Sequence, residues 1–417
     1  MDSQKLNYEI LKKYKYIETF PDYDGDSIVN LMQSIQTFFG VNSDSSYQNI
    51  EYQGLKFDIF NPNINSKASN IENVFLIIID GLGYNYLNNS TLNLFLKRNI
   101  KTQLTSVVPP TTAAALTTFY TGLAPKNHGI PAWFTYLKEF GLISKVPPLT
   151  TREFNFKWIM NKSILKELFE FSSIFERIKA RSYCLVPKYY LNTSYTSFLT
   201  SNSQMIGIEN LEDLLEFGLN ITQNIPGKKL LIGYWPNFDT SAHETGLYSE
   251  RTLNELQSID KIVENFISKS ESKLQKTLFI ITADHGFLDI ETKNQIFIEK
   301  EFPEFKKFLT MPLCGEARLP FCYIRASKAS EFMNFVTKNM NEICELISVD
   351  ELINSNLLGY FKPHNKLFDR LGDFMLIMKN GFVLKDLILG GKESNENLKS
   401  YHGGLSTNEM IVPLIFW

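Results

Sequence analysis

Three short apolar segments that each end at a carboxylate constrain the fold more than any other feature of the chain. They read VFLIIID at 74–80, KLLIGYWPNFD at 229–239 and TLFIITAD at 277–284. Continuous apolar runs of this length are typical of strands buried on both faces of a parallel sheet. Stretches with apolar residues at helical spacing lie between them, such as residues 249–274. The alternation predicts an α/β fold with a doubly wound, mostly parallel central sheet, helices on both faces and inserted cap segments.

The carboxylates that end these segments are the first candidates for a functional site. In a sheet of this type ligands bind beyond the carboxyl ends of the strands, where Asp80, Asp239 and Asp284 would lie. His243 follows Asp239 by four residues, so one helical turn would bring both side chains onto the same face. His285 follows Asp284 directly. Either pair alone is common in structural settings, and the prediction depends on their combination.

A third histidine, His402 in YHGG, completes a set of candidate metal ligands. The set is Asp80, Asp239, Asp284, His243, His285 and His402. Mixed imidazole and carboxylate ligands suit zinc, manganese or iron, and the histidine content favours zinc. Six ligands are too many for one tetrahedral catalytic site and fit two metal ions with three protein ligands each. We therefore predict two divalent ions, with Zn²⁺ favoured and Mn²⁺ or another divalent ion as the alternative.

The segment VVPPTTAAALTTFYTG at 107–122 reads as the start of a helix. Proline suits the entry to a helix, threonine caps it, and alanine is the best helix former. A helix N-terminus also favours a bound anion, so a threonine there can meet a phosphate. The two-metal site lacks a nucleophile, and this helix start supplies one in Thr112.

The composition excludes several classes of function. With 42 Lys+Arg against 45 Asp+Glu, the net charge of -3 gives no basic excess for nucleic-acid binding. The first twenty residues lack the apolar core of a secretory signal, and no run approaches the roughly 20 apolar residues of a membrane span. The four cysteines are dispersed without zinc-type spacing, so we expect them to be reduced, mostly buried and typical of a cytoplasmic protein.

The chain between these motifs predicts the domain organisation. Residues 1–70 are weakly patterned and are expected to form an N-terminal extension packed on the core, with a catalytic domain over 71–417. Within it we expect a cap insertion at about 134–228 and a second excursion at about 295–375. A strand at 319–324, a helix at 328–346 and a hairpin at 373–385, turning at Lys379-Asn380-Gly381, are expected in or beside the second excursion.

Five motifs carry a resemblance to a known family. IIIDGLG, PPTTAAALTTFYTGLAPKNHGI, FDTSAHETG, ITADHGF and YHGGLSTNEMIVPL resemble the alkaline phosphatase superfamily, and are most similar to its type I phosphodiesterase/nucleotide pyrophosphatase branch. They occur in the family's order over 74–417. The resemblance implies that one metal is held by Asp239, His243 and His402, and the other by Asp80, Asp284, His285 and the Thr112 oxygen.

The same resemblance implies the chemistry. Counting back nine residues from Thr121 in Thr-Gly-Leu makes Thr112, rather than Thr111, the nucleophile, and leaves Thr111 as the helix cap. The implied reaction is in-line attack by Thr112 on a phosphodiester or pyrophosphate bond of a small-molecule or nucleotide-type substrate, through a phosphothreonine that water then hydrolyses. A phosphomonoesterase or a metal-dependent phosphomutase is the alternative, and a non-catalytic binding module is the rival from another class. The oligomeric state stays open.

Trp133 is where the chain departs from the family, which has an asparagine there that helps to hold a phosphoryl oxygen. Its indole offers one N–H donor and a large apolar face, so stacking on a base, walling the pocket and plain core packing all stay open.

The remaining candidates receive structural interpretations. We expect His128 to be a turn histidine bonded to backbone and His364 to be a surface loop residue. Glu316 and Arg318 are expected to form a surface ion pair rather than to line a substrate pocket. A tyrosine cluster is expected to pack in the core rather than to wall the cleft: Tyr183, Tyr189, Tyr190 and Tyr195.

Overall fold

The central sheet places the three apolar segments side by side. The computed structural model describes residues 5–41, 50, 52–157, 160–388 and 398–417. Seven strands form this sheet, in the spatial order β2 (Ile100–Thr105), β18 (Ile411–Phe416), β9 (Thr277–Thr282), β1 (Asn73–Ile79), β8 (Lys229–Trp235), β6 (Arg181–Pro187) and β7 (Gln204–Ile208). The strands from β9 to β7 run parallel, and β18 runs antiparallel to both of its neighbours. This confirms a mixed α/β fold with a mostly parallel central sheet.

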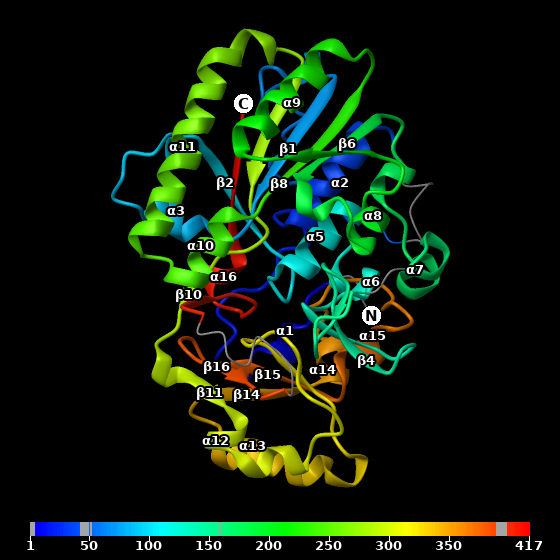
Figure 1. Ribbon diagram of the computed structural model, residues 1–417, viewed down its shortest axis with the longest axis vertical. Coiled ribbons are helices and arrows are strands. Elements are labelled where there is room, and N and C mark those ends of the chain that lie inside the picture. The colour runs from blue at the N-terminus through cyan, green and yellow to red at the C-terminus, as the bar shows by residue number, and fades with distance from the viewer. Residues whose placement is uncertain (1–4, 42–49, 51, 158–159, 389–397) are drawn as a thin grey trace.

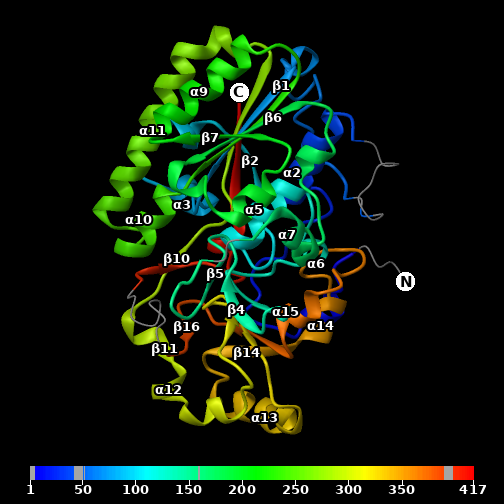
Figure 2. The same ribbon diagram turned by 45° about the vertical axis from the view of Figure 1, so that its right-hand side comes forward.

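Burial explains why these strands read as apolar runs. Every residue of β1, β8 and β9 is buried, and β1 lies between the other two in register, with Asn73 opposite Lys229 and Thr277. Figures 1 and 2 show α9 (Leu211–Asn224), α10 (Asn237–Thr245) and α11 (Glu250–Ser270) on one side of the strands, with α2 (Ile28–Phe38) and α5 (Thr112–Thr121) on the other. The helix expected at 249–274 is confirmed as α11.

A second sheet of seven strands lies at the other end of the molecule (Figure 1). Its order is β14 (Cys344–Ser348), β15 (Phe374–Met378), β13 (Pro320–Cys322), β12 (Cys314–Gly315), β3 (Phe134–Leu137), β4 (Leu142–Lys145) and β5 (Thr150–Thr151). All of its strand pairs are antiparallel. Two further sheets have two strands each. In one, β10 (Leu288–Asp289) pairs with β17 (Ser400–Tyr401), and in the other β11 (Gln295–Phe297) pairs with β16 (Val383–Lys385).

The second sheet corrects the expected boundaries of the inserted segments. The segment 134–228 is not one insertion, because β6 and β7 belong to the central sheet while β3, β4 and β5 belong to the second one. The segment 295–375 is not a separate excursion either, because its β12 pairs with β3 through Gly315 and Phe134. The two segments therefore meet in a single sheet.

The region around the expected hairpin differs in its pairing. The turn forms, with Phe382 N–H donating to Lys379 O at 3.1 Å, and Gly381 adopts the positive φ of 84° that glycine favours. The flanking strands do not pair, because both edges of β15 are taken by β13 and β14, and β16 pairs with β11 instead. The expected helix at 328–346 ends earlier, as α13 (Ala329–Asn339), and β14 takes the residues that follow.

The remaining helices connect and cover these sheets. The short ones are α1 (Tyr8–Leu11), α3 (Tyr84–Asn89), α4 (Phe95–Arg98), α6 (Pro125–His128), α7 (Lys162–Phe169), α8 (Ser194–Leu199), α12 (Ile298–Glu301), α14 (Val349–Asn354), α15 (Leu367–Leu371) and α16 (Thr407–Met410). In the N-terminal segment, α2 begins with a capping box of Ser27 and Asn30, and Gln33 Nε2 donates to Gly122 O at the end of α5 at 2.9 Å. The segment 1–70 thus supports the helix that begins at Thr112.

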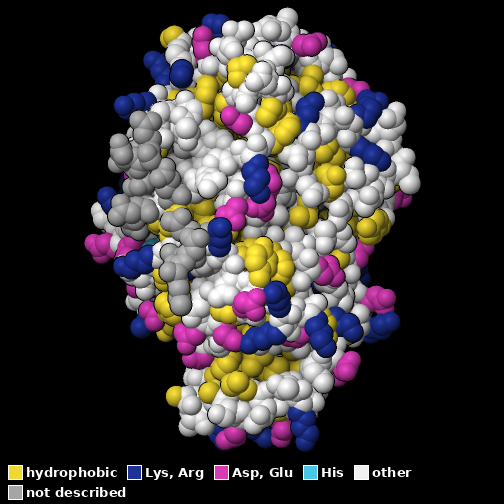
Figure 3. All heavy atoms as spheres, turned by 180° about the vertical axis from the view of Figure 1, so that it is seen from behind, with side chains coloured by type: hydrophobic (Ala, Val, Ile, Leu, Met, Phe, Trp, Pro, Cys, Tyr) yellow, Lys and Arg dark blue, Asp and Glu magenta, His cyan; other side chains and the backbone are white. Residues whose placement is uncertain are grey.

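The surface shows no strong segregation of charge on the face drawn in Figure 3, where basic and acidic side chains are interspersed. All four cysteines, Cys184, Cys314, Cys322 and Cys344, are free and buried. No helix in the described part of the chain is both long and apolar enough to cross a lipid bilayer.

Candidate active site

The central sheet brings the three predicted carboxylates to one edge. Asp80 directly follows β1, Asp284 comes two residues after β9, and Asp239 lies in the first turn of α10, after β8. Because β9, β1 and β8 are neighbours that run parallel, their carboxyl ends meet at the same edge. Asp80 and Asp284 are fully buried, and 16% of the Asp239 side chain is exposed.

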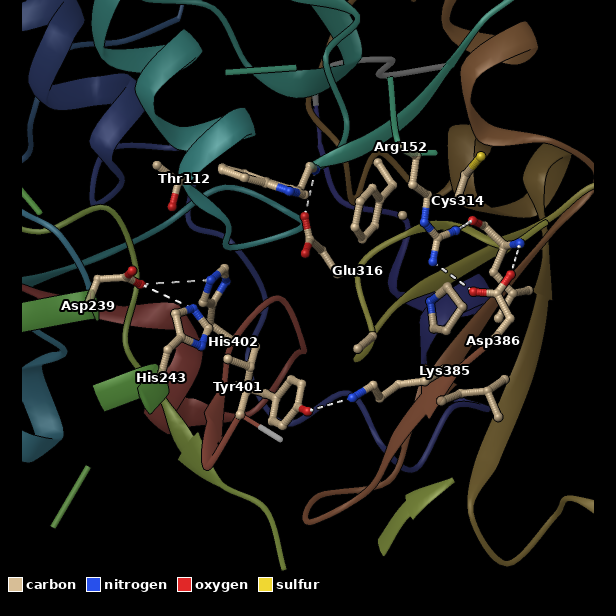
Figure 4. A pocket seen from close by; sticks show the side chains of 18 of the residues that line it. Thr112, Arg152, Asp239, His243, Cys314, Glu316, Lys385, Asp386, Tyr401 and His402 are labelled. Atoms are coloured by element: carbon tan, nitrogen blue, oxygen red, sulfur yellow. Dashed lines mark hydrogen bonds and ion pairs between the residues drawn. The ribbon is translucent and has the colours of Figure 1, made fainter. Parts of the chain in front are cut away.

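The three predicted histidines face these carboxylates. His285 Nε2 lies 3.3 Å from Asp80 Oδ1 and 3.4 Å from Asp284 Oδ2. Asp239 Oδ1 lies 3.4 Å from His243 Nε2 and 4.0 Å from His402 Nε2 (Figure 4). The rings of His285 and His402 stack with their centroids 3.8 Å apart. The ligand atoms form two adjacent clusters, one of Asp239, His243 and His402 and one of Asp80, Asp239 and His285, with Asp239 common to both.

The hydrogen bonds of the carboxylates leave one oxygen of each pointing into the clusters. Asp80 Oδ2 accepts a hydrogen bond from the Tyr234 hydroxyl, and Asp284 Oδ1 accepts from the backbone N–H groups of Gly81 and His285, both at 3.0 Å. Among the described residues, no donor reaches Asp80 Oδ1, Asp239 Oδ1 or Asp284 Oδ2, although all three atoms are buried. A buried carboxylate oxygen without a donor is costly, and a cation would relieve that cost.

Backbone carbonyl groups orient two of the three histidines, His243 and His285, whereas His402 Nδ1 has no hydrogen-bond partner among the described residues. The Nδ1 atom of His243 lies 2.8 Å from Ser400 O, and that of His285 lies 3.2 Å from Gly286 O. A backbone carbonyl at Nδ1 fixes the tautomer in which Nε2 carries the lone pair, which is the arrangement found at metal sites. The donor set and its unpaired oxygens therefore fit divalent metal ions.

Burial and crowding also shift the proton affinities of the cluster. Burial raises the pKa of Asp239 to about 7. Burial, reinforced by the neighbouring Asp80, raises the pKa of Asp284 to about 8. Burial raises the pKa of Asp80 well above its ordinary value and lowers the pKa of His402 well below its own. These residues disfavour their charged forms when no cation is bound, so protons and metal ions compete for the same atoms.

Thr112 lies beside the clusters as the first residue of α5. Its Oγ1 is 3.3 Å from His285 Nε2, and its side chain is almost fully buried. Thr111 occupies the N-cap position with extended backbone, as expected, but its side chain makes no capping hydrogen bond. The cap prediction is thus right for the position of Thr111 and wrong for its side chain.

A pocket of about 350 Å³ leads away from Thr112 towards the second sheet (Figure 4). Asp239, His243 and His402 line its near end. At its far end Arg152 Nη2 donates to Asp386 Oδ1 at 2.7 Å, and the guanidinium of Arg152 lies 4.1 Å from the centre of the Phe134 ring. The site therefore lies between the two sheets, with ligands on one side and a largely apolar wall on the other.

The sequence profile of the type I phosphodiesterase / nucleotide pyrophosphatase family matches residues 74–404. This chain belongs to that family. The resemblance inferred from the five motifs is confirmed, and membership makes the protein a hydrolase of the phosphodiesterase type. No curated protein sequence matches the chain significantly.

Solved structures of ectonucleotide pyrophosphatase/phosphodiesterase 5 have a similar fold. The mouse protein is 16% identical with a TM-score of 0.61, and the match covers 82% of this chain and 87% of that one. An inactive threonine-to-alanine variant of the mouse protein, in complex with AMP, matches with the same values. The human protein is also 16% identical, with a TM-score of 0.60 over the same coverage. Identity this low shows likeness in fold alone.

Several pocket residues of this phosphodiesterase were missed or misjudged from sequence. Glu316 and Arg318 do not form a surface ion pair. Glu316 lines the pocket, where its Oε1 accepts from Trp133 N–H at 2.7 Å and burial raises its pKa to about 7. Arg318 is fully buried and binds Glu409 through two contacts of 3.1 Å. Arg152 and Asp386 went unnoticed because they are 234 residues apart and share no motif.

The four tyrosines of the predicted cluster lie in different environments. Tyr195 is buried in the core as expected, and it also borders a second, smaller pocket beside Thr112; Tyr190 is only partly buried and lines the same pocket. Tyr183 is buried as expected, whereas Tyr189 is 65% exposed.

His128 is confirmed as a turn histidine, because its Nδ1 accepts from Ile130 N–H at 3.1 Å. His364 is not a surface residue. It is buried against Gly129, and its Nε2 lies 3.0 Å from Phe169 O.

Proposed function

We propose that this phosphodiesterase is a two-metal phosphohydrolase that cleaves phosphodiester or pyrophosphate bonds through a phosphothreonine on Thr112. The observation that supports it best is the position of Thr112, at a helix N-terminus with Oγ1 3.3 Å from His285 Nε2, beside unpaired carboxylate oxygens. In this proposal Asp239, His243 and His402 hold one metal ion, and Asp80, Asp284 and His285 hold the other. Zn²⁺ is the favoured ion because three of the six ligands are histidines.

The chain's own residues define the steps. Bound divalent ions supply Lewis acidity that polarises the phosphoryl group and favours the deprotonated nucleophile. Thr112 is the first residue of α5, so the positive end of the helix would stabilise negative phosphoryl oxygens bound there. In the first step a bond forms between Thr112 Oγ1 and phosphorus, and the bond from phosphorus to the leaving oxygen breaks. The proton lost by the Thr112 hydroxyl passes through water to the leaving oxygen, which departs as an alcohol from a diester or as a phosphate from a pyrophosphate. Water then hydrolyses the ester on Thr112, which releases a phosphate monoester and restores the threonine hydroxyl.

The substrate class follows from the family and one neighbour. An AMP complex is known for the inactive mouse relative, so we propose a nucleotide-type or other small-molecule phosphodiester for this protein. In this proposal the catalytic domain spans residues 71–417, and its central sheet is doubly wound, with helices on both faces. A cytoplasmic location stays a prediction, which the four free and buried cysteines support.

The experiment that tests the function is substitution of the nucleophile. Thr112→Ala should abolish hydrolysis of methyl p-nitrophenyl phosphate while the folded structure and the metal content stay unchanged, as judged by circular dichroism and elemental analysis. Thr111→Ala, one residue away at the N-cap, is the matched control and should retain turnover. Retained diesterase activity in Thr112→Ala would overturn the mechanism. A strong wild-type preference for p-nitrophenyl phosphate would assign the protein to the monoesterases instead.

A further inference from the structure

Two cavities meet at Thr112. The larger one, of about 350 Å³, runs towards the second sheet, and the smaller one, of about 100 Å³, runs between α5 and α8. Four residues line both cavities: Thr112, Trp133, Asp239 and Thr240. A phosphodiester has two ester groups on one phosphorus, so a phosphorus held at Thr112 would direct one group towards each cavity.

The cavities differ greatly in capacity. A water molecule occupies about 30 Å³ in the liquid, so the larger cavity has room for about a dozen non-hydrogen atoms and the smaller one for about three. An aromatic ring fits the first and not the second. A methyl or another group of a few atoms fits both.

Trp133 is the one large side chain among the four shared residues, and its backbone is fixed on both sides. Its N–H donates to Glu316 Oε1 at 2.7 Å, and its C=O accepts from Val146 N–H at 3.1 Å. Within the described residues, no hydrogen bond or aromatic contact involves the indole itself. The backbone of Trp133 is therefore fixed at the junction of the cavities, and the face and N–H of its indole are available to a substrate.

The linings of the cavities indicate which groups they accept. The larger cavity is mainly apolar, with Leu313, Pro320 and Leu384 in its wall, and the charge of Arg152 at its far end is compensated by Asp386. The smaller cavity is narrow, and Tyr190, Tyr195 and Tyr234 border it together with Asp80. A bulky, partly apolar ester group suits the first, and only a small group suits the second.

We propose that Trp133 is a specificity-determining partition between these cavities, and that it makes the enzyme selective for unsymmetrical phosphodiesters. The preferred substrates carry one bulky, partly apolar ester group and one small ester group. Diesters with two bulky groups are excluded by the indole. This inference rests on the proposed diesterase function and adds the substrate class.

The test compares two substrates in two enzymes. Methyl p-nitrophenyl phosphate has one bulky group, whereas bis-p-nitrophenyl phosphate has two. The quantity measured is the ratio of kcat/KM for the bis ester to that for the methyl ester, so the intrinsic reactivities cancel when variants are compared. Trp133→Ala joins the cavities and should raise this ratio by at least about tenfold, the scale by which a tight apolar pocket rejects excess atoms. Trp417→Phe, a tryptophan substitution outside both cavities, should leave the ratio within twofold of the wild-type value.

A binding measurement separates selection from chemistry. In the non-hydrolysing Thr112→Ala background, adding Trp133→Ala should tighten binding of bis-p-nitrophenyl phosphate, measured by calorimetry with metal present, and leave binding of the methyl ester within about threefold. If Trp133→Ala does not fold, Trp133→Phe retains a smaller ring and should shift the ratio in the same direction by less. An unchanged ratio and unchanged binding in a folded variant would overturn the partition alone. A wild-type enzyme with its full metal content that hydrolyses neither diester would instead overturn the proposed function.

Discussion

The two seven-stranded sheets differ in strand direction, in strand length and in the residues that they contribute to the candidate site. The central sheet is mostly parallel, is buried through its middle strands, and presents its ligands where the strands end. The second sheet is antiparallel, consists of strands of two to five residues, and contributes Phe134, Cys314 and Pro320 to the wall of the pocket. The candidate metal ligands thus lie at strand ends of one sheet, and residues that line the pocket lie along the strands of the other.

One buried ion pair joins the two parts. Arg318, between β12 and β13 of the second sheet, binds both carboxylate oxygens of Glu409 in α16, which leads into β18 of the central sheet. Glu409 Oε1 also accepts from Gly404 N–H at 2.8 Å, in the loop that carries His402. The contact therefore holds a candidate metal ligand in place from the side of the pocket wall.

The largest effect is expected from the residue shared by both ligand clusters. Asp239→Asn should lower kcat/KM by roughly 10³-fold or more, because Asp239 is a proposed ligand of one ion and its carboxylate also lies among the ligand atoms of the Asp80 and His285 cluster. Elemental analysis should show weaker retention of both ions. The matched variant Asp386→Asn, a buried carboxylate at the far end of the pocket, should retain both ions. Equal metal loss in the two variants would contradict the assignment of the ligands to the central sheet.

The second largest effect is expected at the buried ion pair between Arg318 and Glu409, which connects the two sheets. Arg318→Met leaves Glu409 as a buried, uncompensated charge and should lower the free energy of unfolding by about 3–5 kcal/mol, measured by urea denaturation. The double variant Arg318→Met, Glu409→Gln removes both charges and should recover part of that loss. A double variant that is less stable than Arg318→Met would show that the pair does not act through its charges.

The central sheet and its candidate metal ligands could be predicted from the sequence because one physical rule connects buried parallel strands with the polar residues that follow them. Strands buried on both faces must be continuously apolar, and the polar residues that follow such strands collect at one edge. Asp80, Asp239 and Asp284 follow this rule, and the helical spacing from Asp239 to His243 needs only local geometry. None of these inferences required knowledge of contacts between distant segments.

The second sheet could not be predicted in the same way. Strands such as β12, of two residues, are too short to show an alternating pattern, and β12 finds β3 only through the tertiary fold. Glu316 and Arg318 were misjudged for this reason, because charges two residues apart resemble a surface pair when the surrounding sheet is unknown. The prediction of a hairpin at 373–385 was wrong for a similar reason. The sequence shows the turn, but it does not show that β13 and β14 pair with β15 instead.

A smaller effect is expected in the pH dependence of stability. For a carboxyl group whose pKa is raised by folding, the folded state binds more protons than the unfolded state between the two pKa values, so stability falls as pH rises through that window. With Asp239 at about 7 and Asp284 at about 8 against ordinary values near 3.9, the Tm of the metal-free protein should fall as the pH rises from about 6.5 to 8, above the range in which the lowered pKa of buried His402 gives the opposite slope. Added Zn²⁺ should restore the Tm most at the high end. A metal-free Tm that rises over this range would contradict the raised pKa values.

The smallest effect is expected from the wall of the second sheet. Phe134→Leu keeps an apolar side chain at the pocket but removes the aromatic face over which the Arg152 guanidinium lies at 4.1 Å. A cation–π contact of this kind contributes about 0.5–2 kcal/mol, so looser placement of Arg152 should raise KM for methyl p-nitrophenyl phosphate by roughly threefold to tenfold. The kcat should change by less than twofold, because a contact made equally in the ground state and the transition state affects binding alone. A variant with a lower kcat and an unchanged KM would show that Phe134 affects the catalytic step. That result would contradict the assignment of substrate binding to the second sheet and of catalysis to the central sheet.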